Sequence, residues 1–481
     1  MTSAGLPWAS RWRGPLRVLA AVLAALALTS CGIPRGGRGP VAFPGLTSTE
    51  VSFTGSGGVT LHGTVVAPPA DGTRRPAVVM LQGAGPVTRA EYRDEAEAYA
   101  RRGLVVLVYD KRTAGYSSTH RDYSVLADDA LAGVELLRAR AEVDPAQTGL
   151  RALSEGAWVG ALAAGRSPDV AFLVTVGAVG LSPARQQGWA YGEFLRHAGV
   201  SGSLGPALRD TALRQATAAG LFPEADYDPL PSWERVHQPV LALWGTEDRE
   251  AAPVESSRLI SRVLDRGGNT RYLVRFLPGA RHNLRITRDG GFDRPDGLAP
   301  GGADLVADWI HGRPLPAGAA APVQERASVA LAPLAWYESS WGQLGALLLF
   351  AAAFLGYPLT AVVRRLRRRP DAVPVPAAVR RSARLLALLG GLTVFGTLGY
   401  LLVLMLDAAA EVGPVLAGRP LVWVMLQLLS AASVLTTIWT AVLAWRRRAE
   451  LAGVVRARLG LLLGAGAVLL PWALYWRLLL P

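Results

Sequence analysis

Short apolar runs alternate with longer amphipathic stretches between residues 50 and 311. The runs are rich in β-branched residues and have the length of buried strands; they cover residues 59–67, 77–81, 104–109, 148–153, 171–176, 240–244 and 271–277. The stretches between them have helical periodicity, at residues 90–101, 123–140, 157–165, 253–266 and 303–311. This alternation predicts an α/β fold, with a mostly parallel sheet covered by helices on both faces.

A different pattern begins at residue 341, where apolar segments without charged residues become long enough to cross a bilayer. They cover residues 341–363, 385–406, 421–445 and 459–476. We therefore predict four transmembrane helices within residues 341–481, preceded by an Ala/Pro-rich linker at 312–340. Because none of the four contains Asp, Glu, Lys, Arg or His, an anchoring or packing role is favoured over a substrate-handling bundle, which stays open.

The N-terminus contains a shorter apolar run, at residues 18–28, behind three arginines. Eleven helical residues reach only about 16 Å, too little for a bilayer, so residues 1–30 are interpreted as a signal peptide. The sequence Leu28-Thr29-Ser30-Cys31 resembles the bacterial lipobox, in which the cysteine is diacylated and becomes the new N-terminus. Cys31 is the single cysteine of the chain. A free cysteine behind an ordinary cleavage site is the alternative.

Charge decides between two classes of partner. The formal net charge is +13, but the basic excess lies in three short segments, 11–17, 364–384 and 446–458, each beside an apolar run. This distribution is typical of membrane orientation, not of nucleic-acid binding. The positive-inside rule places the last two segments in the cytoplasm and residues 32–340 outside, at a bacterial cell membrane. The 51% hydrophobic content excludes a disordered chain.

Ser154 follows the predicted strand 148–153 and directly precedes a predicted helix, with Gly156 two residues later. A serine at such a strand–turn–helix corner is typical of a nucleophile elbow, although Ala152 occupies the place of the usual first glycine. A serine that merely caps the helix is the alternative interpretation.

An acid and a histidine follow Ser154 in the order that this elbow requires. Asp248 follows the predicted strand 240–244, and a Gly-x-x-Asp spacing favours it over its neighbour Glu247. His282 is the one histidine, among six, in the loop after the next predicted strand. A generic histidine is more often a core or surface residue, so the order along the chain is what singles out His282. We expect activity to rise near the reference histidine pKa of about 6.5.

Two backbone N–H groups near the serine must stabilise the oxyanion. The glycine-rich turn after the predicted strand 77–81 favours Ala84 as one donor, and Glu155, the residue after the serine, as the other. A plain turn is the alternative for this glycine run.

Residues 50–311 resemble the serine α/β-hydrolase superfamily, near dienelactone hydrolases and prolyl-oligopeptidase-type domains. The resemblance rests on Gln82-Gly83-Ala84-Gly85-Pro86, Tyr109-Asp110-Lys111-Arg112, Leu153-Ser154-Glu155-Gly156-Ala157-Trp158, Gly245-Thr246-Glu247-Asp248 and Gly279-Ala280-Arg281-His282-Asn283. It implies an α/β-hydrolase fold, hydrolysis through an acyl-serine intermediate, and neither metal nor cofactor. By the same resemblance, residues 181–236 are a cap over the active site; a solvent-exposed insertion is the alternative.

We therefore expect a lipoprotein with a leader at residues 31–49 and a serine hydrolase domain outside the membrane. The expected substrate is a small-molecule or lipid-like carboxylic ester, and membrane lipid is the expected partner. Two alternatives stay open: a serine exopeptidase with the same triad, and a non-catalytic lipoprotein that binds a partner. The sequence has no acidic motif for a substrate amino terminus, and Ser154, Asp248 and His282 are all present, so both rank lower.

The lipid anchor is tested by the variant Cys31→Ser. It should incorporate no radiolabelled palmitate and keep its signal peptide, because no thiol is left to acylate. It should nevertheless stay in the membrane fraction through its C-terminal helices. Persistent palmitate incorporation in the variant would contradict the lipobox interpretation.

The orientation is tested by single cysteines in a background without Cys31. A cysteine within residues 364–384 should resist a membrane-impermeant maleimide in intact cells, because the positive-inside rule places it in the cytoplasm. A cysteine within residues 412–418 should react. Equal labelling of the two loops would overturn the assignment.

Overall fold

The computed structural model describes residues 43–117, 119–367 and 375–480. Cys31, the predicted signal peptide and part of the basic loop 364–384 lie outside the described residues. The chain divides into two compact units. Of the described residues, those within 43–190 and 222–330 form one unit, and those within 191–221 and 331–480 form the other.

An eight-stranded sheet forms the centre of the first unit. Its strands, in chain order, are β1 (Thr47–Thr54), β2 (Thr60–Ala67), β3 (Arg75–Leu81), β4 (Val105–Tyr109), β5 (Val143–Leu153), β6 (Leu173–Val176), β7 (Val240–Gly245) and β8 (Tyr272–Leu277). In space the order is β1-β2-β4-β3-β5-β6-β7-β8. The β1–β2 and β2–β4 pairs are antiparallel, and the other pairs are parallel. These are the order and directions of the α/β-hydrolase fold, so the predicted fold class is confirmed.

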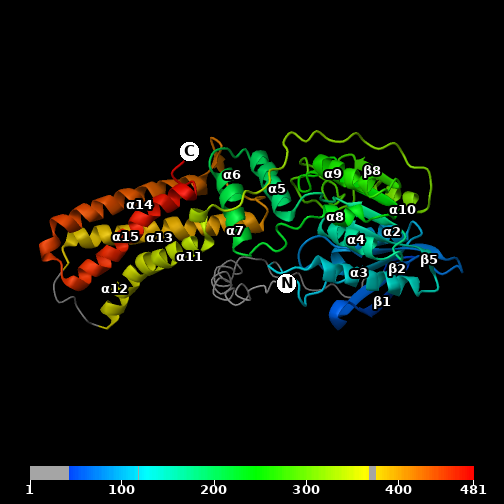
Figure 1. Cartoon of the computed structure of the whole chain (residues 1–481), viewed down its shortest axis with the longest axis horizontal. Coiled ribbons are helices and arrows are strands. Elements are labelled where there is room, and N and C mark those ends of the chain that lie inside the picture. The colour runs from blue at the N-terminus through cyan, green and yellow to red at the C-terminus, as the bar shows by residue number, and fades with distance from the viewer. Residues whose placement is uncertain (1–42, 118, 368–374, 481) are drawn as a thin grey trace, which may run out of the picture. The chain divides into compact units, whose positions relative to one another are not determined.

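Side chains alternate between the two faces of the sheet, and each face has its own core. On β3, Ala77 and Val79 belong to one cluster, and Val78 and Met80 to the other. The first cluster includes residues of α3 (Tyr123–Arg138), α4 (Glu155–Arg166) and α9 (Pro253–Arg266). The second includes residues of α2 (Arg93–Ala100) and α10 (Gly302–Ile310), and Figure 1 labels these helices around the sheet. Burial on both faces explains why the central strands read as continuous apolar runs.

The predicted strands are all present, with bounds that differ by a few residues, but the prediction missed β1. This edge strand has the sequence TSTEVSFT, and most of its side chains are exposed. Because it lacks a strongly apolar face, its pattern differs from that of the buried strands.

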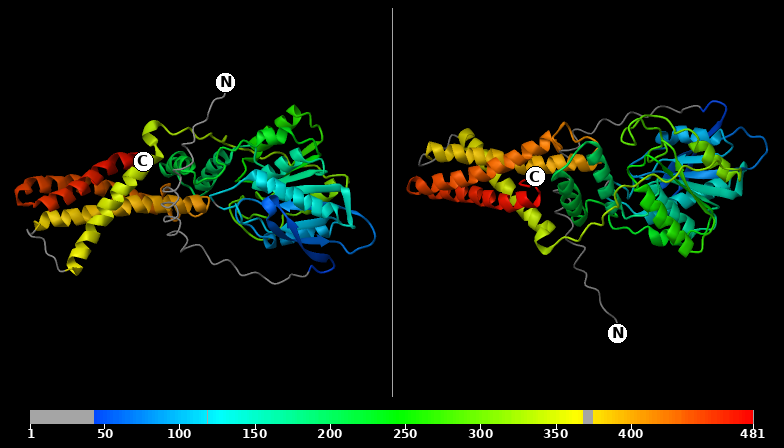
Figure 2. Two further views of the ribbon diagram at one scale, coloured as in Figure 1. Left: turned by 60° about the horizontal axis from the view of Figure 1, so that its bottom comes forward. Right: turned by 90° about the horizontal axis from the view of Figure 1, so that it is seen from above.

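Long apolar helices make up most of the second unit. They are α11 (Ser340–Phe350), a π-helical segment η5 (Ala351–Leu355), α12 (Gly356–Leu366), α13 (Ala377–Leu406), α14 (Leu421–Arg446) and α15 (Gly453–Tyr475). Four spans, Ser340–Arg364, Ala377–Leu406, Leu421–Arg446 and Gly453–Tyr475, are long and apolar enough to cross a membrane, as predicted. Figure 2 shows α13, α14 and α15 running alongside one another, with the α11–α12 segment crossing them obliquely. A Cβ on Gly390 would lie 2.6 Å from the Phe354 ring, so this glycine permits close packing.

Residues 191–221, within the predicted cap, belong to this helical unit and not to the sheet unit. They contain the end of α5 (Pro183–His197), α6 (Leu204–Pro206), the π-helical η3 (Ala207–Ala212) and α7 (Leu213–Ala218). The Trp423 indole N–H donates to Ser203 Oγ at 3.1 Å, and Arg214 forms a 2.7 Å ion pair with Glu338. Polar contacts therefore tie this part of the predicted cap to the C-terminal helices.

These contacts all involve one end of the helices. Glu338 precedes α11, Trp423 lies near the start of α14, and Tyr475, whose hydroxyl contacts Gln215 at 2.6 Å, ends α15. The described parts of the basic segments 364–384 and 446–458 lie at the opposite ends of the same helices, because they follow the far end of one span or precede the next.

Candidate active site

Ser154 stands between β5 and α4 in a strained backbone conformation. Its φ is 53° and its ψ is −115°, which places a residue with a Cβ in a region that favours glycine. Its N–H donates to the carbonyl of Val176 at the end of β6, at 3.0 Å. The side chain makes no capping hydrogen bond, which argues against the helix-cap interpretation. The sharp turn therefore presents the hydroxyl at the carboxyl edge of the sheet.

Glycine permits close approach between the start of α4 and the loop after β3. A Cβ on Gly156 would lie 2.7 Å from the Leu81 carbonyl oxygen, and a Cβ on Gly83 would lie 3.8 Å from the Cβ of Ser154. Ala152, in the place of the usual first glycine, is fully buried in the core. The glycine that this corner requires is thus Gly156, because the side chain of any larger residue at this position would push the helix start away from the loop.

Asp248 and His282 meet beyond the ends of β7 and β8. His282 Nδ1 lies 2.9 Å from Asp248 Oδ2, and both side chains are buried. The other carboxylate oxygen of Asp248 accepts from the N–H groups of Glu250 and Ala251 at 2.8 and 2.9 Å. The neighbouring Glu247 pairs with Arg249 instead. The structure therefore brings Asp248, and not Glu247, to the histidine.

Gly177 connects the serine to this pair. It directly follows Val176, the residue that accepts the Ser154 N–H. Its φ is +56°, and a Cβ built on it would lie 2.6 Å from both Cε1 and Nδ1 of His282. The imidazole thus packs against the backbone next to Ser154, and only glycine leaves room for it. The sequence did not identify this residue.

Opposing effects set the pKa values of the buried pair. Burial of the imidazole lowers its pKa, but the charges of Asp248 and Glu250 and the Asp248 hydrogen bond outweigh this and raise the pKa of His282 to about 9. Burial raises the pKa of Asp248, but His282 and the two backbone donors outweigh it and hold this pKa below its ordinary value. The histidine pKa is therefore higher than the value of about 6.5 that we expected from the sequence.

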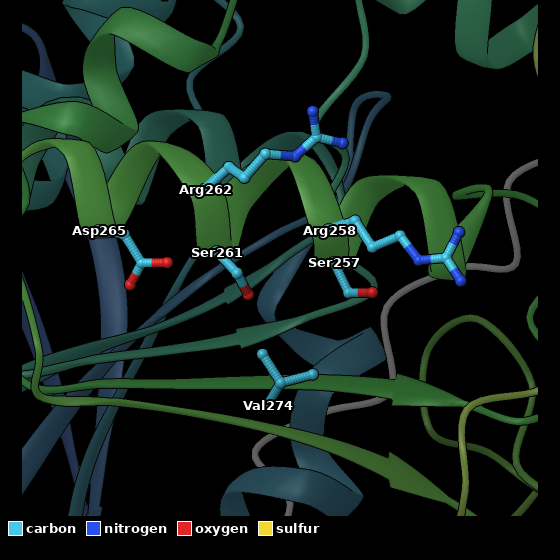
Figure 3. Close-up of a pocket in the computed structure, with 6 residues that line it drawn as sticks. All are labelled: Ser257, Arg258, Ser261, Arg262, Asp265 and Val274. Atoms are coloured by element: carbon cyan, nitrogen blue, oxygen red, sulfur yellow. The ribbon is translucent and has the colours of Figure 1, made fainter.

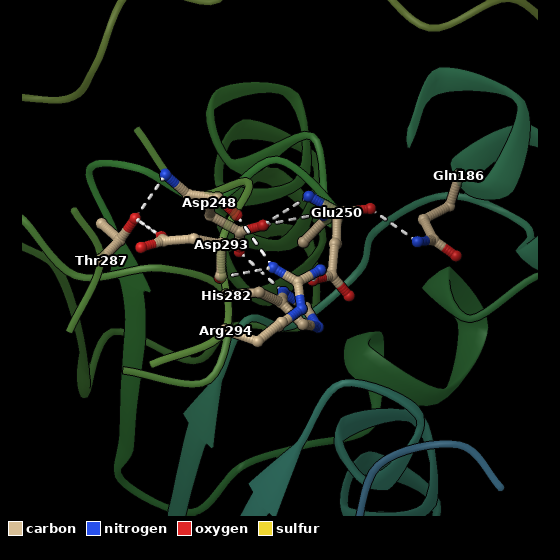
Figure 4. A network of polar contacts seen from close by, with 9 residues as sticks. Gln186, Asp248, Glu250, His282, Thr287, Asp293 and Arg294 are labelled. Carbon is tan, nitrogen blue, oxygen red and sulfur yellow. Dashed lines mark hydrogen bonds and ion pairs between the residues drawn. The ribbon is translucent and has the colours of Figure 1, made fainter. Parts of the chain in front are cut away.

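A shell of polar residues supports the Asp248 loop (Figure 4). Gln186 Nε2 donates to the backbone oxygen of Glu250 at 2.6 Å, and the Glu250 carboxylate pairs with Arg294 at 2.8 Å. Gln186 lies on α5, and Arg294 lies in the long loop after His282. No motif in the sequence identified these contacts, because they join three segments that are distant along the chain.

The two predicted oxyanion donors are free to bind. Within the residues that the structure describes, neither the Ala84 N–H nor the Glu155 N–H has an acceptor, whereas the N–H groups of Gly83 and Gly85 donate to the hydroxyls of Tyr92 and Tyr116. The Glu155 N–H is also the first of helix α4, where the helix dipole favours negative charge. The arrangement suits an anion that forms between the loop and the helix.

A cavity of about 320 Å³ lies elsewhere, between α9 and β8 (Figure 3). Ser257, Ser261 and Asp265 face Val274 across it, and the exposed Arg258 and Arg262 extend along the helix. None of Ser154, Asp248 and His282 lines it, so it is separate from the candidate site. Among the described residues no cluster of three or more His, Cys, Asp or Glu side chains could hold a metal ion.

Comparison with known proteins gives likeness of fold only. No protein-family model and no curated protein matches the chain. A dienelactone hydrolase from Anabaena variabilis is 17% identical, with a TM-score of 0.36, over 56% of this chain and 99% of that one. Thermogutta terrifontis esterase 2 is 20% identical, with a TM-score of 0.39, over 57% and 97%. A puromycin-hydrolyzing peptidase from Mycobacterium tuberculosis is 18% identical, with a TM-score of 0.39, over 57% and 40%.

The raised pKa of His282 predicts the pH dependence of any reaction in which it acts as a base. Only the neutral imidazole accepts a proton, so kcat/KM should rise with pH through a midpoint near 9 and fall away below it. Asp248→Asn removes the charge that raises this pKa, so the midpoint should move to lower pH while the maximum falls. Glu247→Gln is the matched control and should leave the midpoint unchanged. A midpoint that stays the same in Asp248→Asn would contradict the assignment.

Proposed function

We propose that this chain is a membrane-anchored serine hydrolase that cleaves carboxylic esters through an acyl-serine intermediate. The observation that carries this proposal is the arrangement at the sheet edge: Ser154 in a strained elbow, and the buried Asp248–His282 pair across Gly177 from it. A merely structural serine or histidine would not account for both the backbone strain and the close packing of glycine against the imidazole.

In the proposed mechanism, Ser154 Oγ attacks the acyl carbonyl carbon and gives its proton to His282 Nε2. Asp248 orients the ring through Nδ1 and stabilises its charged form. The N–H groups of Ala84 and Glu155 bind the oxyanion. His282 then protonates the leaving alcohol, and a water molecule, deprotonated by the same histidine, releases the acid. The Ser154 hydroxyl makes no hydrogen bond to a described residue, so its contact with Nε2 forms as substrate binds.

The membrane arrangement supports a location outside the cytoplasm. The contacts of residues 191–221 lie at the helix ends opposite the basic segments 364–384 and 446–458, which the positive-inside rule places in the cytoplasm. A lipid on Cys31 would require the same side. We propose a bacterial membrane protein with its hydrolase domain on the outer face and membrane lipid as its partner.

An ester is the proposed substrate class, and a serine exopeptidase with the same triad ranks second. An exopeptidase that acts at the amino terminus of its substrate needs a negative site for the ammonium group. Glu155, Asp248 and Glu250, three acidic side chains at or beside the proposed site residues in sequence, are paired with cations or with His282. This pairing leaves none of the three to bind an ammonium group.

The triad is tested with purified, detergent-solubilised protein and a fluorophosphonate probe. Ser154→Ala should lose all labelling, and Ser154→Ala and His282→Ala should each lower ester turnover by more than about 10³-fold. The double variant should be little worse than either, because the residues act as a unit. Asp248→Asn should cost less than Ser154→Ala and far more than Glu247→Gln, and chelators should have no effect.

A panel of esters compared with aminoacyl amides then separates the two substrate classes. Faster turnover of the amides would favour the exopeptidase. Undiminished ester hydrolysis by Ser154→Ala, in a preparation free of contaminating esterase, would remove this residue from the mechanism and with it the proposed function.

A further inference from the structure

The loop after β3 is held by two tyrosine hydroxyls, one on each side of Ala84. The Gly83 N–H donates to Tyr92 Oη at 3.0 Å, and the Gly85 N–H donates to Tyr116 Oη at 2.9 Å. Tyr92 ends the turn before α2, and Tyr116 lies in the loop after β4. Both rings are buried. The flanking amides are therefore occupied, and the Ala84 amide between them is left to a ligand.

A buried charge cluster connects the same loop to the other predicted donor, Glu155. The Lys111 ammonium donates to the Gly83 carbonyl oxygen, lies 3.0 Å from Glu155 Oε1 and lies 3.3 Å from Tyr116 Oη. Tyr116 donates its proton to Glu155 Oε1 at 2.8 Å, and Arg121 pairs with Glu155 Oε2 at 2.8 Å. The Tyr116 hydroxyl thus donates once and accepts from the Gly85 amide and the ammonium, which uses its full capacity.

Burial makes this cluster rigid. The side chains of Lys111 and Glu155 are 4% and 1% exposed, so each charge needs an ionic partner in a medium of low dielectric. Glu155 is the ionic partner of Lys111, and Glu155 itself pairs with both Lys111 and Arg121. Movement of the loop away from Glu155 would break several charge-assisted hydrogen bonds at once. Burial lowers the pKa of Lys111, and the Glu155 charge opposes that effect.

The residue type at position 111 fits this role. Lys111 is the single lysine among the 50 basic residues of the chain. A compact ammonium with three donors reaches Gly83, Tyr116 and Glu155 together, whereas a planar guanidinium is larger and presents its donors in one plane. An arginine would therefore keep the charge but lose the geometry.

We propose that Tyr92, Lys111, Tyr116 and the Glu155 side chain form a clamp that positions the Ala84 and Glu155 N–H groups as one oxyanion site. The proposal rests on the proposed function, because the oxyanion arises only in that reaction. The need for a clamp comes from the loop itself: Gly83 and Gly85 flank the donor, Gly85 has a φ of +102°, and glycine gives the loop little stiffness of its own. These four side chains are positioning residues that act through the two N–H groups.

The test uses Tyr92→Phe and Tyr116→Phe in the full-length protein. Each variant keeps the ring and removes only the hydroxyl that holds the loop. Loss of one oxyanion donor costs about 10²- to 10³-fold in kcat, so a misplaced donor should lower kcat by about 10- to 100-fold. KM should change by less than about threefold, because substrate and transition state differ at the oxyanion.

A boronic acid provides the measurement that a merely structural role would not change. Ser154 Oγ adds to the boron of phenylboronic acid while His282 takes its proton, and the resulting tetrahedral anion occupies the oxyanion site. Its inhibition constant should rise in each variant by about the same factor as kcat falls. Tyr99→Phe is the matched control: this buried hydroxyl also comes from the α2 region but donates to Glu95 at 2.7 Å and does not touch the loop. The Tyr99→Phe variant should keep the wild-type kcat and the wild-type inhibition constant for phenylboronic acid.

Lys111→Arg gives the same test without changing charge, and serves if a phenylalanine variant fails to fold. Wild-type kcat in the folded variants, or a fall in kcat with unchanged boronate affinity, would overturn the clamp. Ser154→Ala, assayed in parallel, separates failure of the clamp from failure of the proposed hydrolase function. If Ser154→Ala is inactive and the clamp variants behave as wild type, only the clamp fails; if Ser154→Ala hydrolyses ester normally, the proposed function itself fails.

Discussion

The parallel register of β5, β6, β7 and β8 is the constraint on which the candidate site depends. Leu153 and Val176 end β5 and β6 and lie beside Leu243 near the end of β7, and Gly245 pairs with Leu277 at the ends of β7 and β8. Each residue that follows these positions therefore emerges at one edge of the sheet. Ser154, Gly177, Asp248 and His282 are separated by many residues along the chain, and this shared edge alone brings them together.

Burial then makes the arrangement specific. A charged group without water needs a partner in a defined place, and the site contains two such sets: Asp248 with His282, and Glu155 with its cations. A third buried ion pair joins Arg151 on β5 to Glu95 on α2. Arg151 is on β5 and lies 6.0 Å from the ring of Tyr92, so the strand that carries the serine also contacts one of the tyrosines of the clamp. The first two sets limit how far the loops around the serine can move.

Part of the insertion between β6 and β7 belongs to the helical unit and not to the sheet unit. Residues 191–221 make their polar contacts with the ends of the long apolar helices, through Ser203, Arg214 and Gln215. Within this unit the insertion covers the ends of α14 and α15, where their buried tryptophan and partly buried tyrosine need hydrogen-bond partners. A segment that interrupts the hydrolase fold in sequence is thus part of the helical unit in structure.

Local pattern was enough to predict the sheet strands with a strong apolar signal and four helices long and apolar enough to span a membrane. The order along the chain was enough to propose Ser154, Asp248 and His282, and the structure places the last two in contact. Strand burial and helix length appear as patterns within a few neighbouring residues, and the order of a strand-end triad can be followed along the chain. No such pattern identified the exposed strand β1, Gly177, Tyr92, Tyr116 or the division of the insertion between the two units. Their roles come from contacts between segments far apart in the chain: a Cβ at 177 is excluded by His282, and the tyrosines are defined by the amides they accept from. Only the folded chain decides such contacts, because packing and hydrogen-bond partners depend on distance in space and not on separation in sequence.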